Sequence, residues 1–162
     1  MTLSRRTWAA LFALALLGGA AAGGFAQAAD DLNKLQPLVK DADLVITVAD
    51  VGADARFYPV DVDGTRIEVL VVKAPDGTIR TAFNTCQACY ASGRGFYKQQ
   101  GTVLVCQNCG RRFRMSQVEV DAGGCNPLPI FAADKRVTAK TITVPLATLK
   151  KAKGYFRTWK RR

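Results

Sequence analysis

Two C-x-x-C pairs are the part of this sequence in which residue type and spacing most clearly indicate chemistry. Cys86 and Cys89 form the first pair, Cys106 and Cys109 form the second, and sixteen residues separate the two. A C-x-x-C turn directs two sulfurs at one point, so two such turns can supply four thiolates. This donor set suits a tetrahedral zinc, a single iron or a [2Fe–2S] cluster. The spacing therefore predicts a metal centre with these four cysteines as ligands.

A fifth cysteine, Cys125, lies in the turn GGCNPLPI. We expect it to be either an additional ligand or a small buried residue. Two alternatives to a metal centre stay open. Structural disulfides are usual in oxidising compartments, but an odd cysteine fits them poorly. Thiol–disulfide or metal-handling chemistry at a C-x-x-C pair is the other.

The sequence contains no histidine. Its absence excludes His-ligated haem, the two-His ligation of Rieske centres and histidine general bases. No constellation of a catalytic acid, base and nucleophile is visible either. The residues therefore indicate an electron carrier or a metal-dependent binding module rather than an enzyme.

Basic and aromatic side chains flank both pairs. Cations beside the sulfurs would offset their negative charge and offer a docking face to an acidic partner, whereas the alternative is an ordinary solvated loop. These cations are Arg94, Arg111, Arg112 and Arg114. The aromatic residues are expected either to shield the centre from water or to belong to the domain core. They are Tyr90, Phe96, Tyr97 and Phe113.

The net charge of +10 is concentrated at the ends of the chain. Residues 150–162 contain seven cations and no acid, and Arg5 and Arg6 lie in the N-terminal segment. The rest is nearly neutral, which argues against a nucleic-acid-binding face. We treat residues 149–162 as a basic tail. Its Tyr155, Phe156 and Trp159 suggest contact with an anionic membrane surface, with a disordered soluble tail as the alternative.

Residues 1–28 have the pattern of a signal peptide. A cationic start precedes an apolar run, and Ala26-Gln27-Ala28 offers an A-x-A cleavage site. Ser4-Arg5-Arg6 resembles a twin-arginine signal, whose export route carries folded proteins. An uncleaved inner-membrane anchor is the alternative. The pattern predicts a periplasmic protein, with residues 29–44 as a polar lead-in to the domain.

The remaining sequence predicts one small, mostly β domain. Runs rich in β-branched and aromatic residues alternate with turn signals. Asp63-Gly64 predicts a tight turn, and Pro75-Asp76-Gly77 predicts a β-hairpin over residues 65–83. The segment KRVTAKTITVPL predicts one or two further strands, and the residues after it predict a short helix or a frayed end.

The cysteine region resembles two known families. The weaker resemblance is to Rieske domains, whose strand–hairpin–loop pattern is similar to VLVVKAPDGTIRTAFNTC followed by GTVLVCQNCGRRFRM. Cys109 stands where the histidine of the second Rieske loop would be, so the redox properties do not transfer. What this resemblance implies is a fold: a small β-sandwich, Rieske-like or rubredoxin-like, with two C-x-x-C metal loops.

The closer resemblance is to the FtrD-like family of membrane iron–sulfur-containing proteins. It rests on ARFYPVDVDG, DGTIRTAFNTCQACYASGRGFY, VLVCQNCGRRF and GGCNPLPI, in this order, and spans roughly residues 45–148. The resemblance implies an iron–sulfur or other metal centre, association with bacterial iron uptake, and electron transfer at or across the membrane. Longer members carry transmembrane helices before this domain, so this chain reads as the soluble, periplasmic form.

These observations together predict a periplasmic iron–sulfur electron-transfer protein associated with iron uptake. The expected cofactor is a [2Fe–2S] cluster, with a single zinc or iron as the alternative. The expected partners are membrane iron-transport or redox proteins. The alternative functions are a zinc-ribbon-like structural or binding module and a thiol–disulfide or metal-handling protein.

Overall fold

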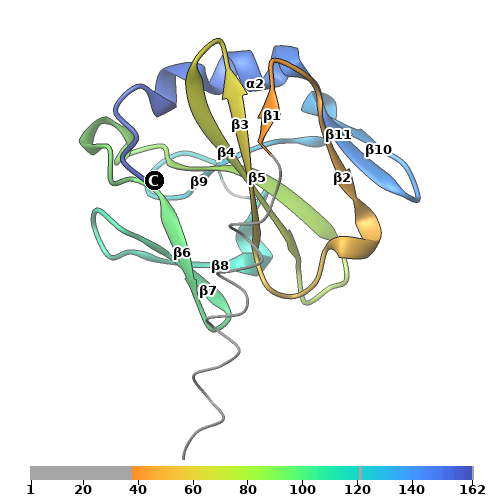
Figure 1. Cartoon of the computed structure of the whole chain (residues 1–162). Helices are drawn as coiled ribbons and strands as arrows, with labels where there is room; N and C mark the ends of the chain where they lie inside the picture. The colour runs from red at the N-terminus through yellow and green to blue at the C-terminus, as the bar shows by residue number, and fades with distance from the viewer. Residues whose placement is uncertain (1–37, 121, 162) are drawn as a thin grey trace, which may run out of the picture.

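The computed structural model describes residues 38–120 and 122–161 (Figure 1). The predicted signal peptide and most of the lead-in lie outside the described residues. Eleven short strands and one helix make up the elements that Figure 1 labels in this part of the chain. The strands are β1 (Val39–Lys40), β2 (Leu44–Thr47), β3 (Arg56–Val62), β4 (Thr65–Lys73), β5 (Ile79–Cys86), β6 (Tyr97–Gln100), β7 (Val103–Cys106), β8 (Arg112–Arg114), β9 (Pro127–Pro129), β10 (Arg136–Val137) and β11 (Thr141–Val144). The helix is α2 (Leu146–Ala152), and the short 3-10 segment η5 (Lys153–Phe156) follows it.

The strands form three sheets. The central sheet has the order β1-β3-β4-β5-β9, and two three-stranded sheets, β10-β11-β2 and β6-β7-β8, complete the fold (Figure 1). The expected mostly β domain is confirmed. The hairpin predicted over 65–83 is also confirmed, because β4 and β5 pair antiparallel around Pro75-Asp76-Gly77. Asp63 and Gly64 both have positive φ, which suits the tight turn predicted between β3 and β4.

The central sheet is buried on both faces, and each face has its own core. One face packs against β2, β11, α2 and η5 through residues such as Val60, Ile142 and Phe156. The opposite face packs against the β6-β7-β8 sheet through residues such as Leu70 and Leu104. Successive side chains of a strand point to opposite faces of the sheet. Since both faces are buried here, the residues of β4 on both faces are mostly apolar, and the strand is a nearly continuous apolar run in the sequence.

The second core contains two of the cysteines. Cys86 is the last residue of β5, Cys106 is the last residue of β7, and both are buried there. The two C-x-x-C loops therefore begin where a strand of the central sheet and a strand of the small sheet end against each other. The fold positions both loops through strand ends, which is the arrangement that the sequence predicted.

Candidate metal centre

The first cysteine loop turns tightly out of β5. The amide of Cys89 donates to the carbonyl of Cys86 at 3.2 Å, and the amides of Ala88 and Cys89 are directed at the Cys86 sulfur. The loop returns through Gly95, whose carbonyl accepts a hydrogen bond from the Cys86 amide at 2.5 Å. A Cβ atom at Gly95 would lie 2.7 Å from the carbonyl carbon of Cys89. Glycine is therefore required for the loop to close this tightly.

The second loop repeats this geometry at the end of β7. The Gly110 amide donates to the Cys106 carbonyl at 2.9 Å, and the Cys106 amide donates to the Arg111 carbonyl at 3.0 Å. Gly110 has a φ of 73°, a conformation that other residues rarely adopt. The amides of Asn108 and Cys109 are directed at the Cys106 sulfur. Each loop thus presents backbone N–H groups to its first, buried sulfur, as metal-binding C-x-x-C turns require.

Cys125 reaches the same place from a third segment. Strand β9 pairs antiparallel with β5 and puts Pro127 opposite Cys86, which brings the preceding turn over the first loop. The Gln87 side chain accepts a hydrogen bond from the Gly123 amide at 2.7 Å and fixes this turn. The Cys125 sulfur lies 3.4 Å from that of Cys86 and 3.0 Å from that of Cys109.

All five sulfurs therefore converge, and four of them form one group in which every pair is close. The sulfurs of Cys86, Cys89, Cys106 and Cys125 all lie within 4.8 Å of one another. The sequence prediction had Cys109 as the fourth ligand and Cys125 as an additional one. The structure places Cys109 at the exposed edge of the cluster, in contact with Cys125.

Four sulfurs at this spacing fit a tetrahedral metal. Zinc–sulfur and similar bonds of about 2.3 Å place tetrahedral ligands about 3.8 Å apart. The donor set is made of thiols alone, which is the chemistry that zinc and iron–sulfur centres use. The donor set therefore fits a thiolate-bound metal or an iron–sulfur cluster, and the spacing fits a single four-coordinate ion without further protein ligands.

The five thiols differ in pKa according to their burial and their hydrogen bonds. Burial raises the pKa of Cys106 to about 12 and also raises that of Cys125. The hydrogen bond with Cys125 lowers the pKa of the exposed Cys109 to about 7. At Cys86, burial acts to raise the pKa, but the nearby Tyr97 hydroxyl, the Cys125 thiol and neighbouring amides outweigh it and lower the pKa. Several protons must therefore leave when a metal binds, so metal affinity will rise with pH.

A polar network that sequence reasoning missed lies behind the first loop. Glu68 is 5% exposed, and its carboxylate accepts hydrogen bonds from Asn84 at 2.7 Å and from Arg161 at 2.6 Å. The Asn84 side-chain oxygen in turn accepts a hydrogen bond from the Tyr97 amide at 2.7 Å. One signal was available: Glu68 interrupts an otherwise apolar strand, and a carboxylate there needs a buried partner.

The flanking residues named from sequence separate into two groups. Tyr97 and Phe113 are buried in the core that contains Cys86 and Cys106. Tyr90 is 37% exposed, and Phe96 is half-buried against the Trp159 ring. The four arginines are all exposed. Among them, Arg111 also reaches the centre through its backbone, because its amide is directed at the Cys109 sulfur.

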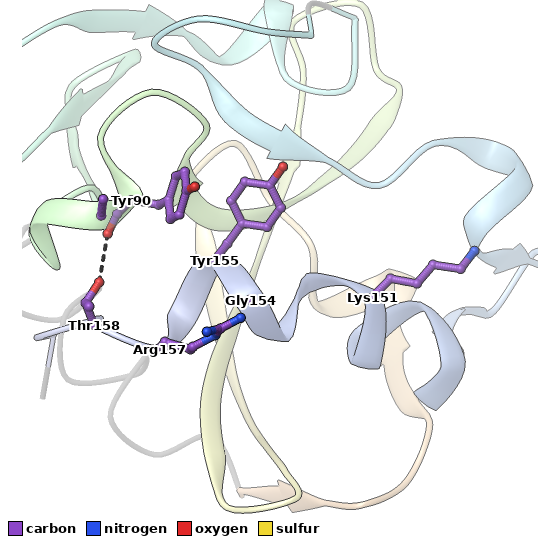
Figure 2. A pocket seen from close by; sticks show the side chains of 7 residues that line it. Tyr90, Lys151, Gly154, Tyr155, Arg157 and Thr158 are labelled. Carbon is purple, nitrogen blue, oxygen red and sulfur yellow. Dashed lines mark hydrogen bonds between the residues drawn. The ribbon is translucent and has the colours of Figure 1, made fainter.

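The C-terminal segment packs along the first cysteine loop. Helix α2 and η5 bury Leu149 and Phe156 in the first core. The Lys160 amide donates to the Gly93 carbonyl at 2.8 Å. The Thr158 hydroxyl donates to the Tyr90 carbonyl at 3.1 Å, and Figure 2 shows this second bond. The predicted basic tail is therefore folded onto the domain up to Arg161, and its helix crosses the expected boundary at residue 149.

A shallow groove of about 510 Å³ lies between this segment and the loop (Figure 2). Tyr90 and Tyr155 meet edge to face in it, with ring centroids 4.8 Å apart. Lys151 and Arg157 line it as well.

The comparisons with known proteins agree with this geometry. The model of the family described as membrane iron–sulfur-containing protein, FtrD-like, matches residues 49–156. No curated protein and no solved structure matches the chain. Within residues 38–120 and 122–161, no helix has the length and apolar character needed to cross a bilayer. The matched region contains every cysteine of the cluster, and the chain belongs to the FtrD-like family of membrane iron–sulfur-containing proteins.

Proposed function

We propose that this protein is a periplasmic electron carrier associated with bacterial iron uptake. The observation that carries the proposal is the convergence of five thiols from three separate segments within an iron–sulfur family. A [2Fe–2S] cluster bound there would accept and donate single electrons. Cys86, Cys89, Cys106 and Cys125 are the proposed ligands, and Cys109 lies beside them.

The surroundings of the sulfurs suit electron transfer. Cys86 and Cys106 are closed off from water by the second core, whereas Cys109 is exposed. An electron would therefore enter and leave at the Cys109 edge, where a partner can approach closely. Arg111 and Arg112 are exposed next to it, and they would attract an acidic partner and offset the charge that reduction adds.

The proposed location follows from the signal-peptide pattern and from the family. Export in folded form would allow the centre to be filled before the thiols meet an oxidising compartment. We propose membrane iron-transport or redox proteins as partners. The exposed cations of the C-terminal segment, such as Arg157 and Lys160, offer a second contact with anionic lipid head groups. Co-sedimentation of the protein with anionic and neutral vesicles tests this contact, and equal binding to both would exclude it.

A single zinc is the second candidate, and the sulfur spacing favours it. Four sulfurs within 4.8 Å of one another fit around one ion, whereas two irons would have to separate the sulfurs further. The protein would then be a structural or binding module in which the metal holds the loops together.

Metal analysis separates the two candidates. The protein is prepared without oxygen, and iron, zinc and acid-labile sulfide are counted per chain, with EPR spectra after reduction by dithionite. About two irons and two sulfides with a reduced-state signal are expected for the electron carrier. One zinc without sulfide would replace it with the structural module.

A further inference from the structure

The Tyr97 hydroxyl is an unexplained polar group inside the second core. Tyr97 is 0% exposed, and its hydroxyl oxygen has no hydrogen-bond partner of standard geometry among the described residues. Leaving a buried hydroxyl unpaired is costly, so such groups normally have an acceptor in the functional state. The candidate acceptor is the Cys86 sulfur, which lies in the same core and interacts with the Tyr97 hydroxyl.

The backbone of Tyr97 is held firmly in this position. Tyr97 opens β6 and pairs with Cys106 across the small sheet. Asn84 holds it from the other side, because its side chain accepts from the Tyr97 amide and donates to the Tyr97 carbonyl at 3.3 Å. Asn84 lies two residues before Cys86 on β5, so the strand that holds Tyr97 through Asn84 also carries Cys86. The ring is therefore fixed relative to both buried sulfurs by elements that carry those sulfurs.

We propose that the Tyr97 hydroxyl donates a hydrogen bond to the Cys86 sulfur when that sulfur is bound to metal as a thiolate. The inference rests on the proposed metal centre and assigns Tyr97 as a residue that tunes it. A metal-bound thiolate is a better acceptor than a thiol, so metal binding supplies the partner that the hydroxyl lacks.

Two consequences follow from such a bond. Hydrogen bonds to ligand sulfurs withdraw negative charge and so favour the reduced, more negative state of an iron–sulfur centre. They also stabilise the bound thiolate itself, whichever metal is present. Removing the hydroxyl should therefore lower the reduction potential of an iron centre and weaken the binding of any metal.

The test compares wild type with Tyr97→Phe, and Tyr58→Phe is the matched control. Tyr58 is also a buried tyrosine, but it lies in the first core, on the opposite face of the central sheet. Cobalt(II) is titrated into the oxygen-free, metal-depleted full chain. The readouts are the dissociation constant and the energy of the sulfur-to-cobalt charge-transfer band. After reconstitution with iron and sulfide, the reduction potential is measured by spectroscopic titration. Melting of each metal-free protein shows whether folding is retained.

Tyr97→Phe is expected to weaken cobalt binding by roughly 10-fold to 100-fold, as loss of outer-shell partners does. It should also shift the charge-transfer band to lower energy and lower the reduction potential, while the metal-free protein melts at least as high as wild type. Tyr58→Phe should leave the metal readouts unchanged. Equal affinity, band and potential in Tyr97→Phe and wild type would overturn the inference and leave the metal centre in place. A wild-type protein that binds neither cobalt nor iron would overturn both.

Discussion

Replacing Arg161 by alanine tests whether the C-terminal segment stabilises the folded domain through a buried ion pair. Arg161 donates to the Glu68 carboxylate at 2.6 Å, and its guanidinium also lies 4.4 Å from the centre of the Phe57 ring. Removing one partner of a buried ion pair typically costs about 3–5 kcal/mol. Glu68 can limit this cost by taking up a proton. For a carboxyl with an ordinary pKa of about 4.3, protonation at pH 7 costs about 3.7 kcal/mol.

The expected loss in the free energy of unfolding is therefore about 3 kcal/mol at neutral pH, or roughly 10 °C in melting temperature. Burial raises the pKa of Glu68 although Arg161 opposes this, and the variant raises it further. The folded variant thus binds this proton more tightly than the unfolded chain does. Relative to wild type, its loss of stability grows as the pH rises from the folded pKa of Glu68 in wild type towards the higher folded pKa in the variant. It should shrink to about 1 kcal/mol near pH 5.

Chemical denaturation at about pH 5 and about pH 8, with the metal content of all proteins fixed, measures this deficit. Lys160→Ala is the matched control, since its exposed side chain should contribute less than about 0.5 kcal/mol. In a Glu68→Gln background, Arg161→Ala should cost much less. A loss that is the same at both pH values and in both backgrounds would refute the buried ion pair as its cause.

Three further predictions concern the centre itself. Cys125→Ser should weaken metal binding strongly, whereas Cys109→Ser should retain a four-thiolate site. The opposite order, measured by cobalt titration, would support Cys109 as the fourth ligand, as the sequence predicted. Gly95→Ala should destabilise the first loop and lower the metal content, because the added Cβ would lie 2.7 Å from a backbone atom of Cys89. An unchanged metal content and melting temperature would show that the loop backbone can shift to accommodate the Cβ. Arg111→Gln with Arg112→Gln should lower the reduction potential, and a potential equal to that of wild type would rule out electrostatic tuning by these side chains.

The sequence predicted the features of the fold that depend on local patterns. The hairpin around Asp76 and the tight turn at Gly64 follow from turn chemistry, and both are present. The two cysteine loops were visible because C-x-x-C spacing is itself a local signal. The family was also identified correctly from the phrases around these cysteines.

The sequence suggested Cys125 only as an additional ligand or a small buried residue, and the position of Cys125 beside Cys86 and the packing of the C-terminal segment were not predictable in this way. Cys125 approaches Cys86 only because β9 pairs with β5, a contact between residues far apart in sequence. The seven cations of residues 150–162 suggested a free tail, because a sequence shows which residues are charged but not which residues they contact. Glu68 lies in a distant strand, and only the fold shows that Arg161 neutralises it.

The same tertiary contacts bear on how thiols could persist in the periplasm, the location that we propose for this protein. The Cys109 and Cys125 sulfurs lie 3.0 Å apart at the surface, so the metal-free protein is open to oxidation at this edge. The other contacts with the first loop come from Tyr97 and from the C-terminal segment, and both follow the loop in the chain. In a chain that crosses the membrane unfolded, these contacts are absent and the five cysteines are not gathered into a metal site. Folding and metal binding before export would instead bury Cys86 and Cys106 and occupy the remaining thiols. We therefore propose that the protein is exported in its folded form, the route whose signal Ser4-Arg5-Arg6 resembles.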